Sequence, residues 1–111
     1  MIVKTGCDIV DINRFERSMK GRLDTIFSPH ELAGAPTIET LAGLFAAKEA
    51  VIKALEMKAG DWQEIEIVKN KSGRPEAKLL EVHSKILSHD ISISHDGDYA
   101  IAVTIFFLNQ K

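Results

Sequence analysis

Three ionisable side chains, in two well-separated stretches of the sequence, have the chemistry to act on a phosphate group. Glu49 and Lys53 are four residues apart, so in a helix they lie on the same side. Asp8 interrupts the apolar run CDIVDI, where an acid needs a partner. Magnesium is typically held by one or two carboxylates, waters and substrate phosphates. Asp8 with Glu49 is therefore a candidate magnesium site, with Lys53 beside it.

Each of these residues also has a purely structural interpretation. On the pair alone, Glu49 and Lys53 are better explained as an exposed helix pair that stabilises by roughly 0.2 to 0.5 kcal/mol. For Asp8, a cap or a salt bridge to Lys4 or Lys53 explains the position as well as a metal does. Asp11 is better explained as a charge at the start of a helix.

A serine–histidine strand near the C-terminus is a second candidate for binding phosphate. In DISISHDGDYA the strand period places Ser92 and Ser94 on one face and His95 on the other, at the mouth of a turn. Adjacent residues on opposite faces, without a nucleophile elbow, argue against a serine protease. Taken alone, His95 is a strand-end residue hydrogen-bonded to its hairpin.

A basic segment follows the first apolar run. Arg14, Arg17, Lys20 and Arg22 place four positive charges within nine residues, opposed only by Glu16. Such a patch favours docking of an acidic partner. A solvated helix face is the common alternative, so the patch supports an interaction only together with other features.

The composition bounds the class of protein. A chain of 111 residues with 45% hydrophobic residues fits one compact domain spanning 1–111, small enough that a subunit interface is a natural place for a large ligand. The net charge of -2 gives no general attraction to nucleic acid. Cys7 is the single cysteine, which excludes an internal disulfide and a zinc knuckle and fits a reducing compartment. The first residues form neither a secretory core nor a membrane span, so we expect a cytoplasmic protein without membrane partners.

The hydrophobic period divides the chain into strands around a helical middle. We expect a strand over 1–12, a short basic helix from Asn13 to Gly21, a helix capped by Ser28 with Pro29 first, and one long helix over 37–58. Four strands in hairpins follow, at WQEIEIV, EAKLLEV, ISISH and YAIAVTIFF. This order predicts an α+β fold, with an antiparallel sheet packed against one long helix.

On a helical wheel, the long helix turns one apolar stripe to the core. Ala42 and Ala46 lie on the shoulder with Glu49 and Lys53, and we expect them to leave space for a phosphate-bearing ligand. Lys48 falls inside the stripe, where it must snorkel outward or meet an anion; snorkelling is the simpler expectation. The stripe itself consists of Leu41, Leu44, Ile52 and Leu55.

Together these segments resemble the holo-acyl-carrier-protein synthases, the small phosphopantetheinyl transferases. The resemblance rests on GCDIVDINRFE, LAGLFAAKEAVIKAL, IEI with NKSGRP, and ISISHDGDYAIAV, which follow the family's order over nearly the whole chain. It implies the phosphopantetheinyl transferase fold. It also implies transfer of 4'-phosphopantetheine from coenzyme A to a serine of apo-acyl carrier protein, as in fatty acid biosynthesis, with release of 3',5'-ADP.

The resemblance also implies roles for individual residues. Asp8 and Glu49 would hold Mg²⁺ against the pyrophosphate of coenzyme A, and Lys53 would neutralise charge on the leaving group. Glu49 acting through a metal-bound water is the preferred base. His95, with Ser92 or Ser94, would contact coenzyme A phosphates.

Other implied features concern partners. The protein would be a homotrimer with coenzyme A at each subunit junction, and the turn of Gly73, Arg74 and Pro75 would lie near the adenine. The basic segment of Arg14, Arg17, Lys20 and Arg22 would meet the acidic recognition helix of the carrier protein.

Some positions depart from the family's pattern. Leu44 stands where a basic residue is common, and Glu56 with Met57 replaces a glycine-containing turn. The segment from Ala33 to Thr40 is short. A non-catalytic coenzyme A or carrier-protein binding module of the same fold is the alternative function, and retention of Asp8, Glu49 and Lys53 argues against it.

Overall fold

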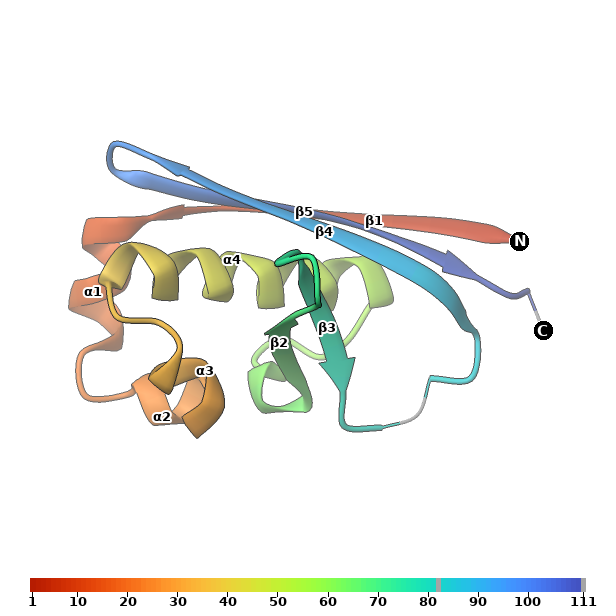
Figure 1. The fold of residues 1–111 in the computed structure, drawn as a ribbon, viewed down its shortest axis with the longest axis horizontal. Helices are drawn as coiled ribbons and strands as arrows, with labels where there is room; N and C mark the ends of the chain where they lie inside the picture. The colour runs from red at the N-terminus through yellow and green to blue at the C-terminus, as the bar shows by residue number, and fades with distance from the viewer. Residues whose placement is uncertain (82, 111) are drawn as a thin grey trace.

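The computed structural model describes residues 1–81 and 83–110 and is built around one long helix, which confirms the predicted α+β class. Helix α4 lies between a three-stranded sheet on one side and the short helices with a β-hairpin on the other (Figure 1). The elements are β1 (Ile2–Asp11), α1 (Ile12–Met19), α2 (Leu23–Ile26), α3 (Pro29–Ala33), α4 (Ile38–Leu55), the 3₁₀ helix η1 (Trp62–Glu64), β2 (Ile65–Lys69), β3 (Pro75–Leu79), β4 (Ile86–Asp96) and β5 (Tyr99–Leu108).

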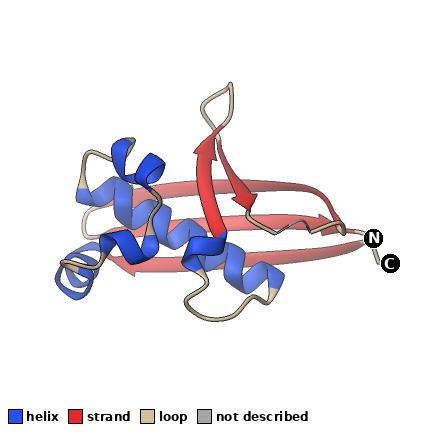
Figure 2. Cartoon of the chain, turned by 90° about the horizontal axis from the view of Figure 1, so that it is seen from below, coloured by secondary structure: helices blue, strands red, loops and turns tan. Residues whose placement is uncertain are grey.

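The strands form two separate antiparallel sheets. The larger has the order β1-β5-β4, so the first strand pairs with the last, and the smaller is the β2–β3 hairpin. Figure 2 shows the hairpin crossing α4 on the side away from the larger sheet. Asp8 lies opposite Ala102 in the β1–β5 register, and Ala102 is fully buried. Because directly opposite residues share a face, Asp8 points to the side of the sheet that carries α4.

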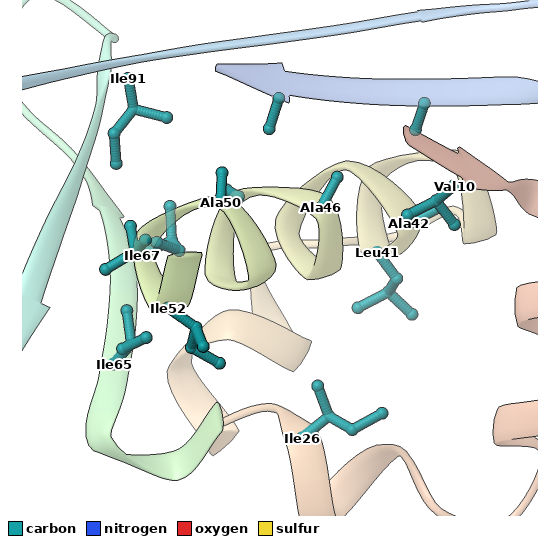
Figure 3. Close-up of a cluster of buried hydrophobic side chains, with 14 of the residues drawn as sticks. Val10, Ile26, Leu41, Ala42, Ala46, Ala50, Ile52, Ile65, Ile67 and Ile91 are labelled. Carbon is teal, nitrogen blue, oxygen red and sulfur yellow. The ribbon is translucent and has the colours of Figure 1, made fainter. Parts of the chain in front are cut away.

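Small residues let α4 lie very close to the sheet. A Cβ atom at Gly6 would lie 1.8 Å from the carbonyl oxygen of Ala50, so no other residue fits there. Ala42, Ala46 and Ala50 are fully buried, and Figure 3 shows Ala46 and Ala50 on the sheet side of the helix. The expectation that alanines leave space for a ligand is therefore wrong, because the sheet fills that space.

The ends of two elements differ from the prediction. Helix α4 stops at Leu55 rather than Lys58, because Glu56 adopts the left-handed conformation with φ of 55° and its N–H bonds to carbonyls of the last turn. The first three residues of the WQEIEIV run form η1, so the strand begins only at Ile65. Within the described parts of the chain, no helix is long and apolar enough to cross a membrane.

The predicted helix caps are confirmed. The Asp11 side chain accepts from the Arg14 N–H at 3.0 Å, and Ser28 and Glu31 form a reciprocal capping box, at 3.1 and 2.8 Å, with Pro29 at the first position of α3. Asp11 is therefore a helix-terminus charge, as expected.

Lys48 does not snorkel outward. Its side chain is buried, with its ammonium 2.7 Å from the Glu31 carboxylate, 2.6 Å from the Ile26 carbonyl oxygen and 3.1 Å from that of Trp62. Burial lowers the pKa of Lys48, while its hydrogen bond to the Glu31 carboxylate opposes that shift. The expectation of snorkelling is wrong because α3 supplies an anion that the helical wheel of α4 alone does not show.

Candidate functional site

Asp8 and Glu49 line one cavity of about 210 Å³, which we call the carboxylate cavity. Strand β1 supplies Asp8, α4 supplies Glu49, and Arg14 with Ser18 of α1 completes the wall. The close packing of α4 on the sheet at Gly6 positions the first two. The structure thus brings together two acids that are 41 residues apart in the sequence, as the metal hypothesis requires.

Lys53 is bound to Asp8 rather than to Glu49. Its ammonium lies 3.1 Å from Oδ1 of Asp8 and 2.9 Å from the carbonyl oxygen of Cys7. Among the described residues, no salt bridge joins Lys53 to Glu49, so the interpretation as an ordinary helix pair is wrong. Lys4 pairs with Glu56 at 3.4 Å instead of Asp8. Lys53 therefore adds a positive charge directly beside the first carboxylate.

Glu49 is held by a residue that sequence reasoning missed. Oε2 of Glu49 accepts a hydrogen bond of 2.9 Å from the indole N–H of Trp62. The WQEIEIV pattern predicts Trp62 in a strand, whereas in the structure it begins η1, after the loop that follows α4. The sequence did offer one indication of this contact. Trp62 is the chain's single tryptophan, and a partly buried indole N–H needs a hydrogen-bond acceptor.

The two carboxylates suit a magnesium ion. In the part of the chain that the structure describes, no three His, Cys, Asp or Glu side chains gather as a closed metal site. Two carboxylates on an open cavity match the protein's usual share of a magnesium site, in which waters and substrate phosphates supply the other ligands. Oδ1 of Asp8 and Oε2 of Glu49 are engaged by Lys53 and Trp62, and the described residues give the other carboxylate oxygens no partner.

His95 lines a different and larger cavity, of about 450 Å³, which we call the His95 cavity. Ile93 on β4, Leu44 on α4, and Lys69 with Pro75 on the hairpin form part of its wall. Leu44 contributes an apolar side chain to that wall. Asp8 and Glu49 are not among the lining residues, so one copy of the chain does not bring His95 and the two carboxylates into one cavity.

Ser92 and Ser94 lie on the outer face of the larger sheet. Both are exposed and stand opposite Val103 and Ile101 of β5. Neither lines the His95 cavity. The predicted alternation of faces is confirmed, and it separates both hydroxyls from the imidazole within one chain.

The turn of Gly73, Arg74 and Pro75 is anchored to the larger sheet. Gly73 has a φ of 88°, a conformation that favours glycine. The Arg74 guanidinium lies 2.8 Å from Oδ1 of Asp90 and 3.3 Å from the Ile91 carbonyl oxygen. The hydrogen bond from Arg74 lowers the pKa of Asp90. This contact ties the hairpin to β4, beside the His95 cavity that Pro75 lines.

The basic segment forms an exposed patch next to the carboxylate cavity. Arg14 and Arg17 lie on α1, whereas Lys20 and Arg22 follow its end at Met19. All four basic residues are exposed. Because Arg14 also lines the carboxylate cavity, the patch is continuous with it.

Comparisons with known proteins identify the family of the chain. Residues 4–104 match the model of the 4'-phosphopantetheinyl transferase superfamily. A holo-acyl-carrier-protein synthase of Geobacter sulfurreducens is 41% identical over 122 positions, covering 95% of this chain and 97% of that protein. One from Sulfurovum is also 41% identical, over 91% of this chain and 93% of the relative.

Solved structures show the same similarity. The Helicobacter pylori holo-acyl-carrier-protein synthase, solved in complex with coenzyme A, matches with a TM-score of 0.82 and 34% identity over 93% of this chain and 99% of that one. A Bacillus anthracis synthase in complex with CoA (3',5'-ADP) matches with a TM-score of 0.80 and 30% identity, over 96% of each chain. The chain therefore belongs to the 4'-phosphopantetheinyl transferase superfamily, among the holo-acyl-carrier-protein synthases.

Proposed function

We propose that this protein transfers 4'-phosphopantetheine from coenzyme A to a serine of an apo-acyl carrier protein in a magnesium-dependent reaction. The observation that carries the proposal is the convergence of Asp8 and Glu49 on one cavity, with Lys53 on Asp8 and Arg14 in the wall. The relatives reported above are named holo-acyl-carrier-protein synthases, which is the name of this activity. Two of the matching structures contain coenzyme A or its 3',5'-ADP part.

The residues would divide the work of phosphoryl transfer. The serine oxygen forms a bond to the β-phosphorus of coenzyme A while the bond from that phosphorus to the bridging oxygen breaks, and 3',5'-ADP leaves with the electron pair. Asp8 and Glu49 would hold Mg²⁺, which supplies charge neutralisation and orientation at the pyrophosphate. Lys53 stabilises negative charge on the leaving group. Glu49 is the proposed acceptor of the serine proton.

We propose that each active site is shared between subunits of a homotrimer. The outer face of the larger sheet exposes large apolar side chains: Ile9 is 63% exposed, Tyr99 52% and Val103 46%. An exposed apolar face of this kind favours contact with another protein surface. A neighbouring copy would bring its His95 cavity, with the turn of Gly73, Arg74 and Pro75, to the carboxylate cavity. Ser92 or Ser94, on the outer face, would join His95 at the coenzyme A phosphates through the same interface.

The basic patch is the proposed docking site for the carrier protein. Arg14, Arg17, Lys20 and Arg22 would attract an acidic helix and steer its serine to the cavity that Arg14 lines. The absence of a second cysteine from the sequence fits a reducing compartment, and we place the reaction in the cytoplasm.

The first test follows the intact mass of a carrier protein. Incubation of apo-acyl carrier protein with coenzyme A, Mg²⁺ and the enzyme is expected to add about 340 Da, the size of a phosphopantetheine group. Asp8→Ala and Glu49→Ala should each reduce the rate by at least about 100-fold, because each removes a ligand of the Mg²⁺ that would neutralise the transition-state charge. Chelation of the metal should stop the wild-type reaction.

Glu64→Ala is the matched control, because this carboxylate lies outside both cavities. It should keep the wild-type rate. Binding of coenzyme A without any mass gain, tested with several carrier proteins, would support the alternative of a non-catalytic binding module.

A further inference from the structure

The indole of Trp62 lies against the carboxylate that the proposed reaction depends on most. Its N–H donates to Oε2 of Glu49 at 2.9 Å. A carboxylate that binds a metal commonly has a second partner of this kind, which fixes its rotamer and orientation.

One stretch of α4 holds Trp62 at three separate points. Phe45 packs against its ring, with centroids 5.7 Å apart, and Lys48 donates to its carbonyl oxygen at 3.1 Å. Glu49 accepts from its indole N–H. Residues three and four apart lie on adjacent positions of a helix surface, so Phe45, Lys48 and Glu49 form one contiguous platform.

This platform is itself rigid. The Lys48 ammonium is fully buried and paired with Glu31, and Phe45 packs on Phe15 of α1 with ring centroids 5.1 Å apart. Turning the indole away from Glu49 would therefore break its packing on Phe45, while the hydrogen bond from Lys48 fixes the backbone of Trp62. A donor fixed in this way holds Oε2 of Glu49 in place. Because the carboxyl group is planar and rigid, the direction of its other oxygen is then fixed as well.

We propose that Trp62 is a positioning residue, which orients Glu49 for metal binding through its indole N–H. The inference rests on the proposed magnesium-dependent transfer and deepens it. Trp62 touches neither substrate nor metal in this role and acts through Glu49 alone. Loss of the N–H should then weaken metal binding while the ring's packing is kept.

The kinetic test is Trp62→Phe, which keeps an aromatic ring beside Phe45 and removes the donor. The Mg²⁺ concentration that gives half-maximal transfer should rise about 10-fold, the usual effect of losing a partner of a metal ligand. At saturating Mg²⁺ the KM for coenzyme A should stay at the wild-type value. Gln63→Ala is the matched control: Gln63 lies in the same 3₁₀ helix, but its amide bonds to the Asp24 carbonyl oxygen, so its Mg²⁺ dependence should be that of wild type.

A spectroscopic test needs no turnover and no Trp62 variant. Because the chain has one tryptophan, a proton–nitrogen correlation NMR spectrum contains one indole N–H signal. Glu49→Gln replaces a charged acceptor with a neutral one, which should move that signal upfield, whereas Glu64→Gln should leave it in place.

The outcomes separate the two proposals. No transfer by the wild-type protein would overturn the proposed function, while the NMR result would still decide whether the indole is bound to Glu49. Normal transfer with an unchanged Mg²⁺ requirement in folded Trp62→Phe would overturn the positioning role alone. An indole signal that is identical in wild type and Glu49→Gln would do the same, even if Trp62→Phe failed to fold.

Discussion

At the scale of single residues, Asp8 and Glu49 are held by the same kind of contact. Each has one oxygen engaged by a donor from elsewhere in the chain, Lys53 for Asp8 and Trp62 for Glu49. The donors differ in charge, because Lys53 carries an ammonium and Trp62 a neutral indole. Asp8 therefore lies beside a positive charge that can also face a phosphate, whereas among the described residues no salt bridge is formed to Glu49.

Replacement of Lys53 by Met should separate activity from stability. The side chain of Lys53 is 55% exposed, so loss of its ion pair should change the free energy of unfolding by no more than about 1 kcal/mol. Transfer should fall about 100-fold, because the leaving pyrophosphate loses a positive charge. Thermal unfolding and the carrier-protein mass assay measure the two effects.

Lys58→Met provides the comparison, since Lys58 is also exposed but lies beyond the end of α4 and lines neither cavity. It should behave as wild type in both measurements. Equal rates for Lys53→Met and Lys58→Met would contradict the assigned role of Lys53.

At the scale of elements, α4 contacts the larger sheet on one side and α3 and η1 on the other. Its alanine side lies against the sheet, which sets the distance between Glu49 and Asp8. On the side away from the sheet, Figure 3 shows Leu41 and Ile52 pointing toward Ile26 and Ile65. The buried Lys48 joins α4 to α3 and to η1. A shift of this helix would therefore move the site and the core together.

The buried pair of Lys48 and Glu31 should be essential for stability. Lys48→Met removes the ammonium and leaves the Glu31 carboxylate buried without its partner, which should lower the free energy of unfolding by about 3 to 5 kcal/mol. Adding Glu31→Gln should recover part of that loss, because no unpaired charge remains. Chemical denaturation of the single and double variants measures the coupling.

Lys71→Met, in the exposed turn between β2 and β3, is the reference for replacing any lysine by methionine, and it should leave stability nearly unchanged. A double variant that is less stable than Lys48→Met would show that the carboxylate is satisfied without Lys48.

The sequence predicted those elements whose signals are local. Strand period, the capping box at Ser28 and the composition of the long helix were enough for the order of the strands, for α3 and for α4 to within three residues, whereas α2 and η1 were not predicted. The burial of Lys48 and the contact of Trp62 with Glu49 were missed, because each depends on packing between segments distant in the sequence. Glu56 shows the same limit: a glutamate in the left-handed conformation ends α4 where sequence preference would place a glycine.

At the scale of the whole molecule, the candidate residues fall into two cavities and one uncovered sheet face. The carboxylate cavity contains the metal candidates and the His95 cavity contains the imidazole, and they share no lining residue. The apolar outer face includes Ile9, next to Asp8 in β1, and Ser94 stands opposite Ile101 on the same face. Association through this face would therefore place residues of one copy near the cavities of the next.

Subunit complementation tests whether the site is shared. Asp8→Ala removes a proposed metal ligand from the carboxylate cavity, and His95→Ala removes a proposed coenzyme A contact from the His95 cavity. Each variant alone should therefore have low transfer activity. When the two are unfolded, mixed in equal amounts and refolded, random assembly of a cyclic trimer leaves about a quarter of the junctions with both wild-type halves. Transfer should then return to about a quarter of the wild-type rate. If each chain held a complete site of its own, the mixture would be no more active than the mean of the two variants, and light scattering would decide whether a trimer had formed at all.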